Sequence, residues 1–128
     1  MTVSSFTSIA LEPPIIIISL QTDTRTHRLV TQANAFAVTI LADDQDDLSD
    51  RFAGRVPDAE DRLASVETET LVSGAPFIKG GLAYLDCRVT QAIPVGSNTL
   101  FLAEVVAAHG EGAGQPLVYH NRKYQKLV

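Results

Sequence analysis

The chain has 128 residues, of which 45% are hydrophobic, and a formal net charge of -5. This length suits a single domain, residues 1–128, that buries its own core without metal or disulfide support. The acidic charge argues against nucleic acid as a partner, because a binder of the phosphate backbone needs a basic face. The apolar run at residues 15–20 is too short to cross a membrane, and the start does not resemble a secretory signal, so we expect a cytoplasmic protein.

Cysteine and acidic residues give no sign of a disulfide framework or a metal site. The single cysteine, Cys87, lies in the apolar run at residues 82–89, so we expect a small core residue in a reducing compartment. The acidic cluster at residues 43–50 lacks the glycine and the final glutamate of a calcium loop. We therefore interpret it as the solvated start of a helix and expect no metal.

The first part of the chain predicts a strand followed by a short helix. The β-branched run at residues 15–20 follows two prolines and predicts a central strand that is buried on both faces. Residues 22–26 then offer several N-caps for a helix over residues 27–33, which Asn34 ends.

The next segment predicts a second strand and a second helix. Residues 36–41 alternate well enough to form a strand. Residues 43–50 open a helix with acids in its first turn, and we expect Leu48, Phe52 and Ala53 to face the core. The pattern then breaks at residues 54–59, and residues 61–71 are compatible with either helix or strand.

The second half of the chain predicts a long hairpin. Its strands are residues 82–92 and 99–108, joined by a turn at residues 94–98. A glycine-rich loop at residues 110–114 leads to a short final strand and turn over residues 117–124. Several strands with two small helices predict a mainly β fold, a barrel with helices at its ends.

The first fourteen residues, MTVSSFTSIALEPP, form a Ser/Thr-rich segment that leads into a Leu-acid-Pro-Pro turn. This pattern closely resembles the flavin-binding signature of the flavin reductase-like family of FMN-binding split barrels. Similar pieces follow in the family's order through residues 24–27, 36–45, 48–54, 81–89 and 116–124. The resemblance implies a Greek-key-like split β-barrel with two short helices. The family's N-terminal helix and first barrel strand are expected to be missing here, which leaves a sheet edge that favours pairing with another chain.

The resemblance also implies an activity. We expect an NAD(P)H-dependent flavin reductase that transfers hydride from NADH or NADPH to FMN or FAD. It would act as a homodimer and supply reduced flavin to a partner monooxygenase. Two alternatives stay open: a flavin- or haem-binding split barrel without catalysis, and an incomplete family member with an impaired site.

The Ser/Thr-rich segment is the first candidate part of the flavin site. The resemblance implies that its backbone follows the flavin and that its hydroxyls face the ring and the ribityl chain. The candidate residues are Val3, Ser4, Ser5, Phe6 and Ser8. Because successive side chains of a strand point to opposite faces, they cannot all line one pocket unless the strand bends. The alternative is a polar edge strand.

The start of the first helix is the second candidate part. Thr24, Arg25 and Thr26 combine two hydroxyls, a guanidinium and the free N–H groups of a helix start, which together suit the FMN phosphate. The alternative is helix capping alone, for which one threonine suffices.

The C-terminal segment is the third candidate part, because His120 and Tyr124 resemble the family's ending. We expect Tyr124 to bind cofactor and His120 to orient the flavin or nicotinamide ring, as a catalytic residue. The alternative is a surface histidine at a strand end. His27 is expected to cap or cover a helix, and His109 to lie at a strand end near the glycine loop. Hydride transfer needs no protein nucleophile, so the absence of a triad is no objection.

Overall fold

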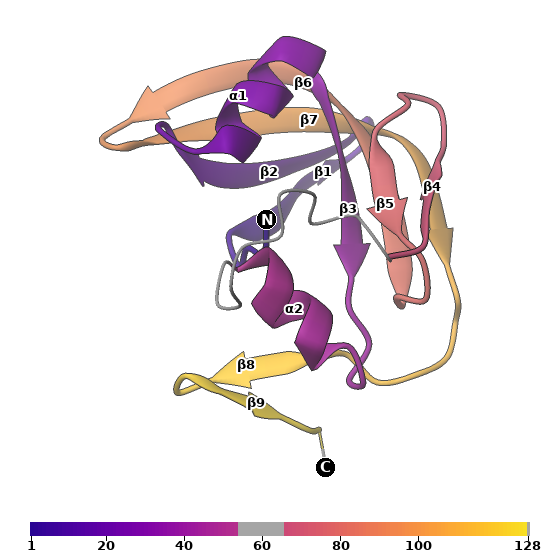
Figure 1. Cartoon of the computed structure of the whole chain (residues 1–128). Coiled ribbons are helices and arrows are strands. Elements are labelled where there is room, and N and C mark those ends of the chain that lie inside the picture. Colours follow the sequence, from indigo (N-terminus) through magenta and orange to yellow (C-terminus); the bar gives the residue numbers. More distant parts are fainter. Residues whose placement is uncertain (54–65, 128) are drawn as a thin grey trace.

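The computed structural model describes residues 1–53 and 66–127, and it is mainly β with two helices (Figure 1). Five strands form one antiparallel sheet in the order β1-β2-β7-β6-β3. Their bounds are Phe6–Leu11 (β1), Pro14–Gln21 (β2), Asn98–Gly110 (β7), Ala83–Val95 (β6) and Ala35–Ile40 (β3). β1 and β3 are the two edges of this sheet, which is consistent with a split barrel. The expected fold class is confirmed.

β2 lies inside the sheet, between β1 and β7, as its isoleucine run predicts. Ile16, Ile18 and Leu20 are buried, and they pack with Phe101 of β7 in the core cluster. The expectation of burial on both faces was wrong, because the intervening side chains, Ile15 among them, are only half-buried. An antiparallel sheet can have one covered face and one open face, and here helix α1 (Arg25–Ala33) covers only the first.

Helix α1, Arg25–Ala33, packs on the covered face through Val30, which belongs to the core cluster. Thr24 is its N-cap, and the helix ends at Asn34, whose φ of 55° lies in the left-handed region that asparagine tolerates. The predicted helix, its cap region and its end are confirmed.

Helix α2, Asp46–Phe52, follows β3 and begins later than expected. The reason is a turn at residues 42–45, in which the backbone N–H of Ala42 donates to the side chain of Gln45. Leu48 and Phe52 are half-buried, whereas Ser49 is buried and Ala53 is exposed, so the expectation for Ala53 was wrong. A short helix packs only one narrow side inward, and Ala53 follows its last turn.

The predicted breaks after α2 lie mostly in the part of the chain that the structure does not describe. This covers the expected break at residues 54–59 and residues 61–65 of the ambiguous segment. The end of that segment is a strand, β4 (Thr68–Thr70), which pairs with β5 (Pro76–Ile78).

The predicted long hairpin is confirmed as β6 and β7, with a loop of only two residues, Gly96 and Ser97. Gly96 has a φ of +58°, a conformation that glycine adopts at little cost. Cys87 on β6 is fully buried in the core, as predicted. Burial raises the pKa of its thiol to about 12, and the neighbouring Asp86 carboxylate adds to the effect.

The chain ends in a separate hairpin of two short strands, β8 (Val118–His120) and β9 (Lys123–Gln125). Figure 1 shows it beneath α2, away from α1 and the long hairpin. Its loop residues, Asn121 and Arg122, both have positive φ, of 52° and 62°.

Candidate functional site

The candidate site begins where β2 ends and the chain enters α1. The hydroxyl of Ser5 donates to the carbonyl oxygen of Ser19 (3.0 Å) and accepts from the N–H of the same residue (3.2 Å). Ser19 lies two residues before the end of β2, and Thr24 lies three residues after it. The Ser/Thr-rich segment and the helix start therefore lie at the same end of the sheet.

The side chains of β1 divide between the two faces of the sheet. Phe6 and Ser8 lie opposite Ile18 and Ile16 of β2, so they share the face that α1 covers. Thr7 lies opposite Ile17, on the other face. A bulge bends β1 only after Ser8.

The hydroxyl groups of the segment also differ in what they bind. The hydroxyl of Ser5 forms hydrogen bonds with the backbone of β2. Ser4 and Ser8 are exposed, and within the described residues their hydroxyls have no protein partner. Val3 is also exposed, at 41%. The groups best placed to meet a ligand beside α1 are therefore those of Phe6 and Ser8, with Val3 and Ser4 leading into them.

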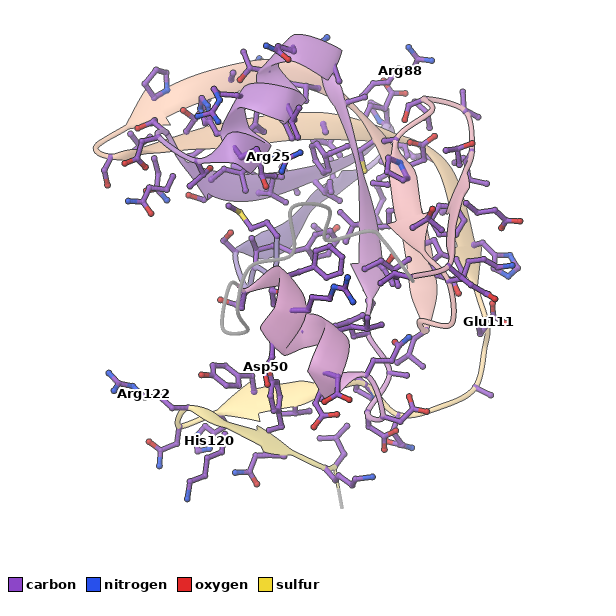
Figure 2. All side chains as sticks on the ribbon, viewed as in Figure 1. Arg25, Asp50, Arg88, Glu111, His120 and Arg122 are labelled. Carbon is purple, nitrogen blue, oxygen red and sulfur yellow. The ribbon has the colours of Figure 1, made fainter. Side chains whose placement is uncertain are left out.

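The helix start offers a second set of polar groups. Thr24 acts as the cap, since its hydroxyl donates to the carbonyl oxygen of Gln21 (2.8 Å) and accepts from the N–H of His27 (3.3 Å). The guanidinium of Arg25 and the hydroxyl of Thr26 make no ion pair or hydrogen bond to the rest of the described chain. Figure 2 shows Arg25 at the end of α1 next to β2. With the unpaired N–H groups of the first turn, these groups can bind an anion.

The C-terminal candidates lie elsewhere. Figure 2 shows His120 and Arg25 on opposite sides of α2, so one chain does not bring them together. His120 is exposed near the end of the short hairpin. The hydroxyl of Tyr124 donates to a carboxylate oxygen of Asp50 on α2 (2.6 Å), which anchors β9 to that helix.

Helix α2 connects these two ends of the chain. The N–H of Thr2 donates to the carbonyl oxygen of Phe52 (3.0 Å), and the Thr2 hydroxyl donates to that of Ser49 (2.7 Å). One helix therefore holds both the segment before β1 and, through Asp50, the C-terminal hairpin.

Sequence reasoning missed the residues that hold the candidate site in place. Ser19 had a signal, because it is the one polar residue in the apolar run at residues 15–20. Thr2 and Asp50 had none, since a threonine near a chain start and an aspartate in an acidic helix are ordinary surface residues.

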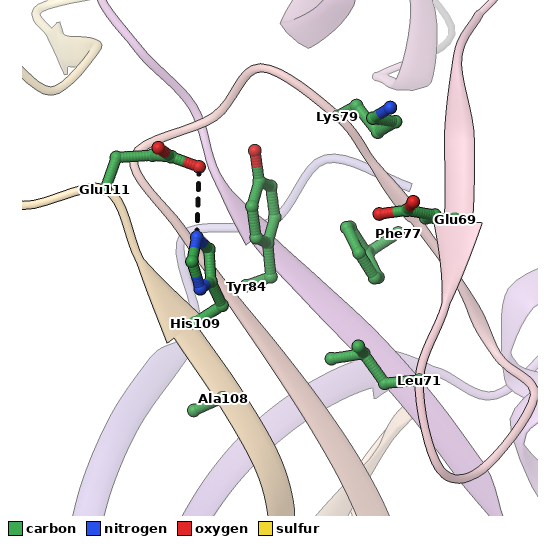
Figure 3. A pocket seen from close by; sticks show the side chains of 8 residues that line it. All are labelled: Glu69, Leu71, Phe77, Lys79, Tyr84, Ala108, His109 and Glu111. Atoms are coloured by element: carbon green, nitrogen blue, oxygen red, sulfur yellow. Dashed lines mark ion pairs between the residues drawn. The ribbon is translucent and has the colours of Figure 1, made fainter.

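A groove of about 390 Å³ lies at the other end of β6 and β7 (Figure 3). Tyr84 forms its centre, with the ring of Phe77 at 4.5 Å and the nearly parallel ring of His109 at 6.0 Å. His109 pairs with Glu111 at 3.3 Å, at the strand end where it was expected. The ten residue-to-residue steps of β7 from Thr99 to His109 span about 33 Å, so this groove is separate from the helix start.

Neither helix of the described chain is long and apolar enough to span a membrane. Within residues 1–53 and 66–127, no cluster of three or more His, Cys, Asp or Glu side chains could hold a metal ion.

Comparison with known proteins connects this geometry to one family. A family model described as "Flavin reductase like domain" matches residues 1–128. The chain is 33% identical over 126 residues to the FMN reductase (NADH) RutF of Stutzerimonas stutzeri, covering 98% of this chain and 72% of that protein. It is 35% identical over 124 residues to the reductase component of the FADH(2)-dependent resorcinol hydroxylase of a Rhizobium species, covering 97% and 69%.

A solved structure agrees with these relatives. The NADH:FAD oxidoreductase SgcE6 of Streptomyces globisporus, in complex with NAD and FAD fragments, superposes with a TM-score of 0.88 at 29% identity. The match covers 97% of this chain and 74% of that one. The chain thus spans about 70% of the length of its relatives.

Proposed function

The chain belongs to the flavin reductase-like domain family, and from this membership we propose that it is a flavin reductase. It transfers hydride from NADH or NADPH to FMN or FAD. The observation that carries the proposal is the combination of two features on the same face of the sheet. One is Arg25, a cation at a helix start that has no partner within residues 1–53 and 66–127, and the other is the Ser/Thr-rich strand.

Support for FMN comes from the groups that α1 leaves without partners. The guanidinium of Arg25, the hydroxyl of Thr26 and the first-turn N–H groups suit a phosphate dianion in charge and in number of donors. Phe6 and Ser8, with Val3 and Ser4 before them, would follow the ribityl chain and the ring along β1. Ser5 and Thr24 keep a positioning role, because their hydroxyls already serve β2 and the helix cap.

Bound flavin supplies the hydride acceptor, and the protein's part is to hold the two rings in contact and exclude water. His120, as a donor and acceptor on one ring, would orient the nicotinamide or the flavin, and Tyr124 would hold the hairpin that carries it. Since His120 and Arg25 of one chain lie on opposite sides of α2, this role requires the hairpin of a second copy or a movement of the hairpin.

We also propose a homodimer, for which the open face of the sheet is the best candidate surface. Ile15 and Ile17 are half-buried there, and Ile93 and Val95 are 40% and 53% exposed. These side chains make an apolar face that a second copy can cover. Ile93→Glu should yield a monomer in light scattering, whereas a charge at the solvated Glu111 position, Glu111→Lys, should not. An unchanged mass for Ile93→Glu would exclude this face.

The relative named as a reductase component of a hydroxylase supports a further part of the proposal. Reduced flavin would leave the site and serve a partner monooxygenase in the cytoplasm. An exposed site at a strand edge is compatible with such release, because the flavin is held by a few surface groups and not enclosed.

The direct test is flavin-dependent oxidation of NADH and NADPH by the purified protein, followed by the loss of nicotinamide absorbance. We expect turnover with FMN or FAD and none without flavin. Arg25→Ala should weaken FMN binding by about 10- to 100-fold, the range for one charge-assisted hydrogen bond, and leave riboflavin binding unchanged. Arg28→Ala, one turn further along α1, is the matched control. Equal losses for both flavins would refute the phosphate assignment.

A second candidate is a flavin-binding protein without reductase activity, favoured by the distance of His120 from the helix start within one chain. In that case FMN binds, but NADH does not bleach its visible absorbance. For the reductase, His120→Ala should lower turnover and leave flavin affinity unchanged. A loss confined to flavin affinity would move His120 into the flavin site.

A further inference from the structure

The segment that enters α1 is fastened to the tip of the long hairpin. The N–H and the hydroxyl of Thr22 both donate to the carbonyl oxygen of Ser97, at 3.0 and 3.1 Å. Ser97 is one of the two loop residues of this hairpin. The chain between β2 and the helix start is therefore held at one end by the turn of β6 and β7.

The helix start itself is held by a second contact, one residue beyond Thr26. The Nε2 atom of His27 lies 2.8 Å from the hydroxyl oxygen of Thr99 on β7. The ring of His27 also meets Phe101 edge-on, with the ring centres 5.3 Å apart. His27 was expected to cap or cover a helix, but its ring packs against β7 of the sheet, and its polar end has a specific partner there.

The contact between His27 and Thr99 lies in a buried part of the molecule, so its loss should be costly. Thr99 is only 6% exposed, so water cannot readily replace a partner that its hydroxyl loses. Phe101, two residues further along β7, is 1% exposed and belongs to the core. His27 therefore links the first turn of α1, which carries Arg25 and Thr26, to the close-packed core of the sheet.

We propose that Thr99 is a positioning residue for the flavin phosphate. Its hydroxyl holds His27, and His27 sets the position of the adjacent first-turn N–H groups and of Arg25. This inference rests on the proposed phosphate site at the start of α1. Without the hydroxyl, the helix start keeps its residues but loses the fixed geometry that phosphate recognition needs.

The test is Thr99→Val, which keeps the size of the buried side chain and removes only the hydroxyl. We expect FMN to bind about three- to tenfold more weakly, the equivalent of one net hydrogen bond, and riboflavin to bind as before. Thr99→Ser, which retains the hydroxyl, should restore the preference for FMN. The ratio of the two affinities is the readout, because general loosening of the fold would weaken both flavins alike.

Two further variants keep the test decisive. Thr39→Val removes a hydroxyl that bonds both the N–H and the carbonyl of Ile78, between β3 and β5, and it should leave the ratio unchanged. His27→Phe retains a ring against Phe101 and removes the nitrogen, so it should reproduce Thr99→Val even if that variant folds poorly.

Equal weakening of FMN and riboflavin by both Thr99→Val and His27→Phe, or no weakening of either, would overturn the inference. Arg25→Ala, measured in parallel, separates this failure from that of the proposed function. If Arg25→Ala lowers the ratio and Thr99→Val does not, the phosphate site stands and Thr99 has no part in it. If Arg25→Ala leaves the ratio unchanged, the phosphate site is wrong and the inference falls with it.

Discussion

The two hairpins of this chain differ in how they are built into the fold. β6 and β7 have thirteen residues each and lie in the middle of the five-stranded sheet. β8 and β9 have three residues each and, in the part of the chain that the structure describes, pair only with one another. The long hairpin therefore shares the stability of the core, whereas the short one depends on its contacts with the rest of the chain.

Several polar contacts attach the short hairpin and the residues beside it to the rest of the chain. Tyr124 bonds Asp50, Lys126 lies 3.6 Å from a carboxylate oxygen of Asp43, and the N–H of Leu117 donates to the carbonyl oxygen of Leu41 (3.0 Å). Such contacts can open while the core stays folded. The comparison shows that the helix-start site is attached to the long hairpin in the core sheet, whereas His120 belongs to the short hairpin, which can open separately.

The largest effect should come from truncating the core of the long hairpin. Phe101→Ala removes a ring that is 1% exposed, and we expect a loss of about 3–5 kcal/mol in the free energy of unfolding. Tyr119→Ala, the matched change on the short hairpin, removes a ring that is 47% exposed and should cost less than about 1 kcal/mol. Urea denaturation of both variants measures the difference. Similar losses would mean that the two hairpins unfold as one unit.

The second largest effect should be confined to the short hairpin. Tyr124→Phe removes the hydroxyl that donates to Asp50, and a hydrogen bond to a charged group contributes about 1.5–3 kcal/mol. We expect amide hydrogen exchange in β8 and β9 to accelerate, while exchange in β6 and β7 is unchanged. Tyr84→Phe, which removes a hydroxyl that accepts from the N–H of Gly80, is the control at the other end of the molecule. Faster exchange in both hairpins would contradict a separable short hairpin.

The sequence predicted the elements whose periodicity is strong and local. The isoleucine run, the capped helix after it and the long hairpin were all expected, because alternation, cap residues and a glycine turn are signals carried by adjacent residues. The expected burial of β2 on both faces failed. Hydrophobic composition shows that a strand is apolar, but the covering of its second face depends on elements far along the chain.

The candidate site could be predicted only in part, for a similar reason. Arg25 and Thr26 were identified from a motif, and their lack of partners within the described residues is consistent with a binding role. The hydroxyl of Ser5 donates to the carbonyl oxygen of Ser19 and is not free for a ligand. Strand register decides whether a serine hydroxyl faces a ligand or a neighbouring strand, and the sequence does not reveal the register. The link from His27 to Thr99 joins residues 72 positions apart, and no local pattern reveals it.

Substitutions in the turns of the two hairpins should have smaller effects on stability, and of opposite sign. Gly96 has a φ of +58°, so Gly96→Ala should cost about 0.5–1 kcal/mol even though open space surrounds the new methyl group. Arg122 has a φ of +62° without being glycine, so Arg122→Gly should slow hydrogen exchange in β8 and β9 by a factor of about two to five. A stabilising Gly96→Ala, or faster exchange in Arg122→Gly, would show that turn strain does not distinguish the hairpins.

At neutral pH the smallest effect is that of Cys87, which lies on β6 of the long hairpin. Its pKa is raised from 9.0 to about 12, so the folded protein keeps the thiol protonated in a pH range where the unfolded chain ionises. The stabilisation is therefore complete below pH 9 and is lost as the pH rises toward 12, by about 0.4 kcal/mol at pH 9 and at most about 1.4 kcal/mol per further pH unit. Cys87→Ala, which cannot titrate, should show a flatter decline than the parent between pH 8 and 10 in denaturation experiments. The two proteins differ only at this side chain, so parallel curves would mean that the thiol reaches water without unfolding, and that even the long hairpin opens locally.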